Sequence, residues 1–245
     1  MISLNKKFIF MHIPRTAGTS IERSVLEPYA HYFEKDRENS LIEANFSDTL
    51  DQNTEYDQGG DFFGKHFSIR DYYAVLTNSE DFDTYFDRDS LVNINSNPLD
   101  HFYKFTVVRN PWDRFVSYYL DYVEDQNEEN FKDFALLAGT LQDASFPKPY
   151  LKNPVSLNLL SQSNVLFNKY TNFNDFDKIL KFENLENDFK DLCDDLDLEY
   201  EALPHLAQSS DRAHYSEYYN EETKGIIEEA WSEDVTNFGY EYETV

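Results

Sequence analysis

Short uninterrupted apolar runs mark the candidate strands of this chain. Residues 8–11 (FIFM) form the first run, residues 105–108 (FTVV) the second, and residues 178–182 (KILKF) contain the third. Apolar runs of this length are typical of strands that are buried on both faces of a parallel sheet. Pro14 stops the first run, so we expect that strand to end before it.

A stretch with helical spacing follows each run. After the first, Ile21, Val25 and Leu26 recur at helical intervals, and Thr19 or Ser20 is the expected N-cap.

The later helices are predicted from the same periodicity. Residues 111–122 begin with proline and place aromatic side chains on one stripe, and residues 185–196 are amphipathic. Residues 221–238 read as one closing helix that ends at Gly239. Strands that alternate with helices indicate an α/β fold with a central, mostly parallel sheet flanked by helices. We expect a single domain over residues 1–245, with an acidic surface insertion at about 34–61.

Composition narrows the choice of partners. The 245 residues include 47 acids and 21 bases, which gives a formal net charge of −26. Such a surface repels nucleic-acid phosphate and anionic lipid, so we expect neither as a partner. Aromatic residues make up 17% of the chain, which is more than a disordered acidic segment carries. A single cysteine and the lack of an apolar run of membrane-spanning length favour a cytoplasmic protein.

The segment from His12 to Ser20 is the first that carries chemistry. A strand that turns sharply into a helix exposes backbone N–H groups whose partial positive charge favours an anion. Gly18 permits close approach of the backbone. Additional cationic and hydroxyl donors in the segment are Arg15, Thr16, Thr19 and Ser20. A Walker A loop does not fit, because no Gly-Lys pair precedes Thr19; a plain strand-to-helix turn is the alternative.

The segment from Val107 to Tyr119 is the second. Arg109 lies at the carboxyl end of the predicted strand, where ligands bind in open α/β sheets. Ser117, eight residues later, lies about two turns along the helix and near the same face. The pair can hold a second phosphate. Alternatively, Arg109 forms a local ion pair with Asp113 and Arg114 is exposed.

Together the two segments resemble the 5′- and 3′-phosphate motifs of sulfotransferases that use 3′-phosphoadenosine 5′-phosphosulfate (PAPS), particularly the carbohydrate-type branch. That branch reads H-I-P-K-T-x-G-T-S and then F-x-x-V-R-N-P-x-D-R-x-x-S-x-Y. Residues 203–215 look like its C-terminal cofactor loop, and residues 182–185 (FENL) and 238–240 (FGY) resemble later landmarks. The resemblance implies a P-loop NTPase-like three-layer fold and transfer of a sulfuryl group to a carbohydrate hydroxyl.

The resemblance also assigns roles to residues. Arg109 and Ser117 would hold the 3′-phosphate, and Arg212 would close over the cofactor. The 5′-phosphosulfate would be cradled by Arg15, Thr16, Ala17, Gly18, Thr19 and Ser20. Arg15 stands where the family usually has lysine. It would be catalytic by neutralising charge on the bridging oxygen, so we expect no metal requirement.

A base must accept the proton of the acceptor hydroxyl, and histidine suits this role near neutral pH. We predict His66, which lies between the two phosphate motifs in a G-K-H element of the kind found in related enzymes. A surface or structural role is the alternative for His66, and His12 is expected to orient the loop. The acidic exterior favours a neutral or weakly charged sugar acceptor. A P-loop kinase and a non-catalytic nucleotide- or glycan-binding relative remain alternatives, and the sequence does not determine an oligomeric state.

Overall fold

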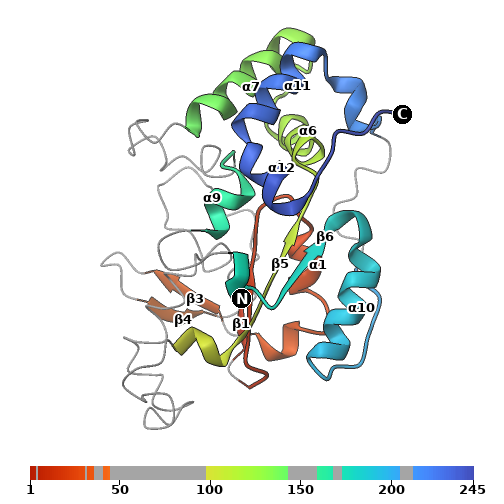
Figure 1. Ribbon diagram of the computed structural model, residues 1–245. Coiled ribbons are helices and arrows are strands. Elements are labelled where there is room, and N and C mark those ends of the chain that lie inside the picture. Colours follow the sequence, from red (N-terminus) through yellow and green to blue (C-terminus); the bar gives the residue numbers. More distant parts are fainter. Residues whose placement is uncertain are drawn as a thin grey trace.

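The computed structural model describes residues 1–3, 5–30, 32–35, 41–44, 98–142, 159–167, 173–204 and 212–245. A four-stranded sheet lies at the centre of this part of the chain (Figure 1). Its order is β1 (Ile2–Ser3), β2 (Phe8–Met11), β5 (Tyr103–Val108) and β6 (Lys178–Lys181). β1 is antiparallel to β2 and the other neighbours are parallel. The three predicted strands and the mostly parallel sheet are confirmed.

Two hydrophobic cores lie on opposite faces of this sheet. Along β2, Phe8 and Phe10 belong to one core, whereas Ile9 and Met11 belong to the other. Successive side chains of a strand point to opposite faces, so burial on both sides explains the uninterrupted apolar run. The first core contains residues of α1 (Gly18–Glu22) and α10 (Leu185–Asp195). The second contains residues of α6 (Pro111–Tyr122), α7 (Glu128–Leu141), α9 (Gln162–Leu166), α11 (Glu221–Ala230) and α12 (Ser232–Phe238).

The start of α1 differs from the prediction. Neither Thr19 nor Ser20 is its N-cap, because the helix begins at Gly18 and both residues lie inside its first turn. Ala17 takes the cap position with a φ of 67° and no side-chain cap bond. The loop before α1 therefore ends in left-handed backbone.

Two predicted helices also differ in extent, one by ending early and the other by being interrupted. α1 stops at Glu22, because the amide and the hydroxyl of Ser24 both donate to the carbonyl of Ile21. The closing stretch is two helices, α11 and α12, which are separated at Trp231. The buried indole of Trp231 donates to the carbonyl of Leu159, so packing determines where the helix breaks. The predicted end at Gly239 is confirmed by its φ of 64°.

Shorter elements connect these units. The predicted insertion at about 34–61 lies largely outside the described residues, but β3 (Tyr32–Lys35) pairs antiparallel with β4 (Leu41–Ala44). Single turns of 3₁₀ helix are η1 (Glu27–Tyr29), η4 (Pro98–His101), η6 (Phe173–Asp175), η7 (Phe182–Asn184) and η8 (Tyr215–Tyr218). No helix in the described ranges has both the length and the apolar character to cross a bilayer. The assignment of one domain to residues 1–245 stays a prediction.

Candidate functional site

The segments predicted to carry chemistry meet at the carboxyl edge of the sheet. Residues 12–17 follow β2, Arg109 and Asn110 follow β5, and η7 follows β6. Asn110 caps α6, since its side-chain oxygen accepts from the amides of Trp112 at 3.1 Å and Asp113 at 3.3 Å. Ligands of open α/β sheets bind at this edge, so the topology places both segments where a ligand is expected.

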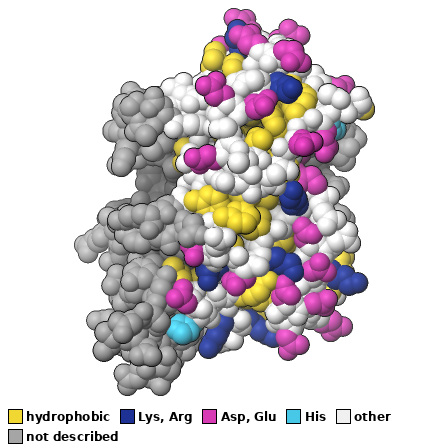
Figure 2. Space-filling model, viewed as in Figure 1, with side chains coloured by type: hydrophobic (Ala, Val, Ile, Leu, Met, Phe, Trp, Pro, Cys, Tyr) yellow, Lys and Arg dark blue, Asp and Glu magenta, His cyan; other side chains and the backbone are white. Residues whose placement is uncertain are grey.

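Among charged side chains on the molecular surface, acidic ones are more frequent than basic ones. Figure 2 shows Asp and Glu distributed over the described part of that face with fewer Lys and Arg between them, in keeping with the net charge of −26. The overall field of such a molecule repels anions. An anion site therefore depends on local cations and on backbone N–H groups.

The loop of residues 12–17 has the backbone shape of an anion site. Arg15 and Ala17 both have a φ of 67°, in the left-handed region. Turns of this kind direct successive N–H groups into a concavity that suits an anion. The hydroxyl of buried Thr16 donates to the carbonyl of Ile13 at 2.8 Å, so Thr16 stabilises the loop from within.

A buried side-chain pair connects the start of this loop to the end of α1. His12 Nδ1 lies 2.9 Å from Glu22 Oε1, and both side chains are almost completely buried. Gly18 packs directly on the imidazole: a Cβ there would lie 2.0 Å from both Cδ2 and Nε2 of His12. The expectation that His12 orients the loop agrees with this geometry. The role of Glu22 as the partner of His12 was not predicted. An acidic residue among the apolar positions of a helix was the signal that could have indicated it.

The guanidinium of Arg15 extends to α6. Its Nε donates to Ser117 Oγ, its Nη2 donates to the Ser117 carbonyl, and its Nη1 donates to Asp121 Oδ2, each at 3.1 Å. The assignment of Ser117 and Arg109 to one phosphate stays a prediction. Arg15 contacts both residues, through its guanidinium to Ser117 and through its carbonyl to Arg109.

Arg109 is held by both segments. Its Nε and Nη2 lie 2.7 Å from Asp113 Oδ2, and its Nη1 donates to the Arg15 carbonyl at 3.1 Å. The guanidinium carbon lies 4.1 Å from the centre of the Phe182 ring. Burial lowers the pKa of Arg109, and the nearby Asp113 opposes this effect. The ion pair between Arg109 and Asp113 is therefore present, and the phosphate role of Arg109 stays a prediction.

Arg212 comes to the same carboxylate from the C-terminal loop. Its Nη2 pairs with Asp113 Oδ1, so one carboxylate holds two of the assigned arginines. Its Nη1 is buried and has no hydrogen-bond partner within the part of the chain that the structure describes. A buried donor without a partner is costly, so this atom has unused capacity for an acceptor.

Arg114 corrects one detail of the sequence interpretation. It was expected to be exposed in the ion-pair alternative, but its exposed fraction is 0%. It donates to the carbonyls of Pro14 at 3.1 Å and Leu160 at 3.0 Å and to the Tyr118 hydroxyl at 3.3 Å. These acceptors compensate for its burial. Arg114 is therefore a structural support of the loop.

A further set of polar groups, missed from the sequence, fixes the end of β5. The side-chain amide of Gln162 accepts from the Arg109 amide and donates to the Arg109 carbonyl, both at 2.8 Å. Asp234 in turn accepts from the amides of Gln162 and Ser163 at 2.7 Å. Burial raises the pKa of Asp234, and Arg114 and the two amides oppose that rise. Lone polar residues far apart in sequence give no pattern that predicts such a network.

The remaining predicted residues fall into two groups. Ser20 is buried in α1, and Thr19 is half-buried. His66, the predicted base, lies outside the described residues.

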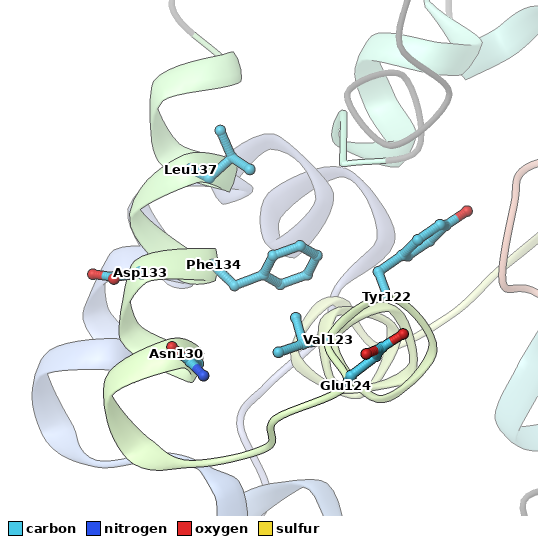
Figure 3. A pocket seen from close by; sticks show the side chains of 7 residues that line it. All are labelled: Tyr122, Val123, Glu124, Asn130, Asp133, Phe134 and Leu137. Atoms are coloured by element: carbon cyan, nitrogen blue, oxygen red, sulfur yellow. The ribbon is translucent and has the colours of Figure 1, made fainter. Parts of the chain in front are cut away.

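A separate hollow of about 410 Å³ lies between the end of α6 and α7, and its lining begins at the residue after Asp121 (Figure 3). It is lined by Tyr122, Val123, Glu124, Asn130, Asp133, Phe134 and Leu137.

The fold and this edge define an α/β protein whose arginines converge on a site suited to an anion. The model of the Sulfotransferase family matches residues 1–241, and the chain belongs to that family. Neither a curated protein nor a solved structure matches the chain. The family establishes a transferase that moves a sulfuryl group from a sulfate donor to an acceptor substrate. The resemblance seen in the two motifs is confirmed at this level.

Proposed function

We propose that this enzyme transfers the sulfuryl group of PAPS to a hydroxyl of a carbohydrate acceptor, on a P-loop NTPase-like three-layer fold. Family membership supports sulfuryl transfer in general, and the carbohydrate branch is consistent with that family. The sheet with a core on each face is the arrangement that such a fold requires. We propose a neutral or weakly charged sugar as the acceptor, because the acidic exterior repels anionic polymers.

The observation that carries the proposal is the convergence of three arginines. Arg109 donates to the carbonyl of Arg15, and Asp113 holds both Arg109 and Arg212. PAPS presents a phosphosulfate and a separate 3′-phosphate, so it requires cations at both ends. The buried Nη1 of Arg212 offers a donor that a phosphate oxygen can accept. These residues fit the donor.

The chemistry of each residue follows from its type. Bound PAPS supplies the activated sulfuryl group. Arg15 stabilises negative charge on the bridging oxygen without donating a proton, because arginine is not deprotonated near neutral pH. A phosphate leaving group with a second pKa near 6 needs little protonation. In this proposal His66 accepts the proton of the acceptor hydroxyl, positioned for in-line attack.

Adenosine 3′,5′-bisphosphate (PAP), the product of the donor, provides the direct test of the site. We expect calorimetry to detect binding to the wild-type protein and a loss of affinity of about tenfold or more in Arg15→Ala and in Arg109→Ala, because a charged hydrogen bond contributes about 1.5–3 kcal/mol. Lys190→Ala removes one positive charge from an exposed position of α10 and serves as the control. Undiminished binding in both arginine variants, or no binding by the wild type, would contradict the proposal.

The base is tested by separating binding from turnover. His66→Ala is expected to reduce transfer from labelled PAPS to a sugar acceptor by about a hundredfold or more, the size of a general-base contribution. Its affinity for PAP should stay within about twofold of the wild type, since a base contributes little to ground-state binding. The control is His101→Ala, at an exposed histidine of η4. Full activity of His66→Ala would exclude His66 as the base.

A further inference from the structure

One stripe of α6 carries the acceptors for all three arginines. Asp113, Ser117 and Asp121 are spaced by four residues, which places them on adjacent turns of one helix face. Asp113 holds Arg109 and Arg212, whereas Ser117 and Asp121 hold Arg15. The second predicted phosphate motif, residues 107–119, includes Asp113 and Ser117. Asp121 lies beyond it, and no role has been given to it so far.

The contacts of Arg15 indicate what Asp121 contributes. The two bonds to Ser117 use the Nε and Nη2 atoms, and the bond to Asp121 uses Nη1. Three of the five N–H donors of a guanidinium are thereby engaged, and two remain for a ligand. Arg15 belongs to a left-handed loop position and its side chain is 34% exposed, so without these contacts it is free to adopt other rotamers. Asp121 and Ser117 together fix the plane of the guanidinium.

The negative charge of Asp121 opposes binding of the anionic donor, although its hydrogen bond orients Arg15. Its side chain is 47% exposed, and its carboxylate lies 3.1 Å from the guanidinium that would contact the phosphosulfate. A negative charge close to an anion site weakens binding of the anion. The same carboxylate therefore improves the orientation of Arg15 and lowers the affinity for the donor.

We propose that Asp121 is a positioning residue that orients Arg15 for sulfuryl transfer while lowering affinity for the anionic donor. This inference rests on the proposed function, because that function gives Arg15 its role. The positioning role also accounts for arginine at position 15. A planar guanidinium can donate to three fixed acceptors on one helix face, whereas an ammonium is a point charge without a preferred plane.

Asp121→Asn separates the two effects. It retains the size of the side chain and an acceptor oxygen but removes the charge. We expect kcat to fall by about twofold to fivefold, the range for a partly exposed ion pair. We expect the Kd for PAP to decrease, because the negative charge beside the anion site is removed. Asp191→Asn, an exposed position of α10, makes the same charge change away from the site and is the control.

A purely structural role predicts a different pattern, in which kcat, PAP affinity and thermal stability decline together. That result would overturn the proposal, as would values for Asp121→Asn that match those of Asp191→Asn in an active protein. Asp121→Glu keeps the charge and is expected to recover part of the lost kcat. Absence of transfer and of PAP binding in the wild type would instead refute the proposed function and this inference with it.

Repeating the Asp121→Asn substitution in the Arg15→Ala protein tests whether Asp121 acts through Arg15. In Arg15→Ala, Asp121→Asn should change the residual turnover by less than about 1.5-fold, because effects on one interaction are not additive. A loss of the same size in both backgrounds would overturn the positioning role. Circular dichroism melts of all variants confirm that folded proteins are compared.

Discussion

Arg15→Ala is expected to lower the rate of sulfuryl transfer by about a hundredfold to a thousandfold, the usual effect of deleting a group that stabilises charge in a transition state. Alanine removes the positive charge and also the three hydrogen bonds from the loop to α6. Arg15→Lys should retain substantial activity, since an ammonium supplies the same charge with less fixed geometry. Initial rates at saturating PAPS and acceptor provide the measurement.

The comparison of the two Arg15 variants is informative because both change the same side chain. If charge is what matters, the order of rates is wild type, lysine and then alanine. The Lys190→Ala protein, used above as a binding control, should have the wild-type rate because Lys190 is an exposed residue of α10. Equal rates for arginine, lysine and alanine at position 15 would refute the catalytic assignment.

Gly18→Ala is expected to disrupt the loop despite adding only one methyl group. The new Cβ would lie 2.0 Å from two atoms of the His12 ring, which is buried and bonded to Glu22. The ring has to move, so we expect a loss of about 2–3 kcal/mol of stability from overpacking. A displaced loop should also reduce transfer by about a hundredfold, as misplacement by an ångström can do. Thermal unfolding and the transfer assay measure the two effects.

Gly225→Ala is the matched control. Gly225 lies on α11 and a Cβ there meets no atom within 4 Å. We expect this change to raise stability by about 0.5–1 kcal/mol, because alanine is the better helix former. Combining His12→Ala with Gly18→Ala removes the clash, so the double variant should be less destabilised than the sum of the single ones. Wild-type stability and activity of Gly18→Ala would contradict this account of the loop.

Much of the fold is predictable from local pattern. The runs at 8–11 and 105–108 are buried strands because both faces of the sheet are covered, and Pro111 starts α6 as predicted. Where the prediction fails, the cause is tertiary packing that a local pattern does not contain. The Trp231 indole finds its acceptor on Leu159, and this packing divides the predicted closing helix in two.

The site is only partly predictable. Arg15 and Arg109 were expected at one edge of the sheet, because carboxyl ends of parallel strands coincide. The hydrogen-bond partner of Arg15 on α6 was not predicted. The pairing of Arg15 with Asp121 joins residues 106 positions apart and depends on how α6 lies against the loop. Arg114 was misjudged because a charged residue is expected at the surface, and only the structure reveals its three acceptors.

Arg114 also affects how the molecule responds to heat or denaturant. This one interior cation donates to Pro14 in the loop, to Leu160 two residues before α9, and to Tyr118 in the middle of α6. When the loop opens, this buried cation loses the Pro14 carbonyl, one of its acceptors, and that loss costs free energy. We therefore expect opening of the loop to be coupled to loosening of the packing around α6.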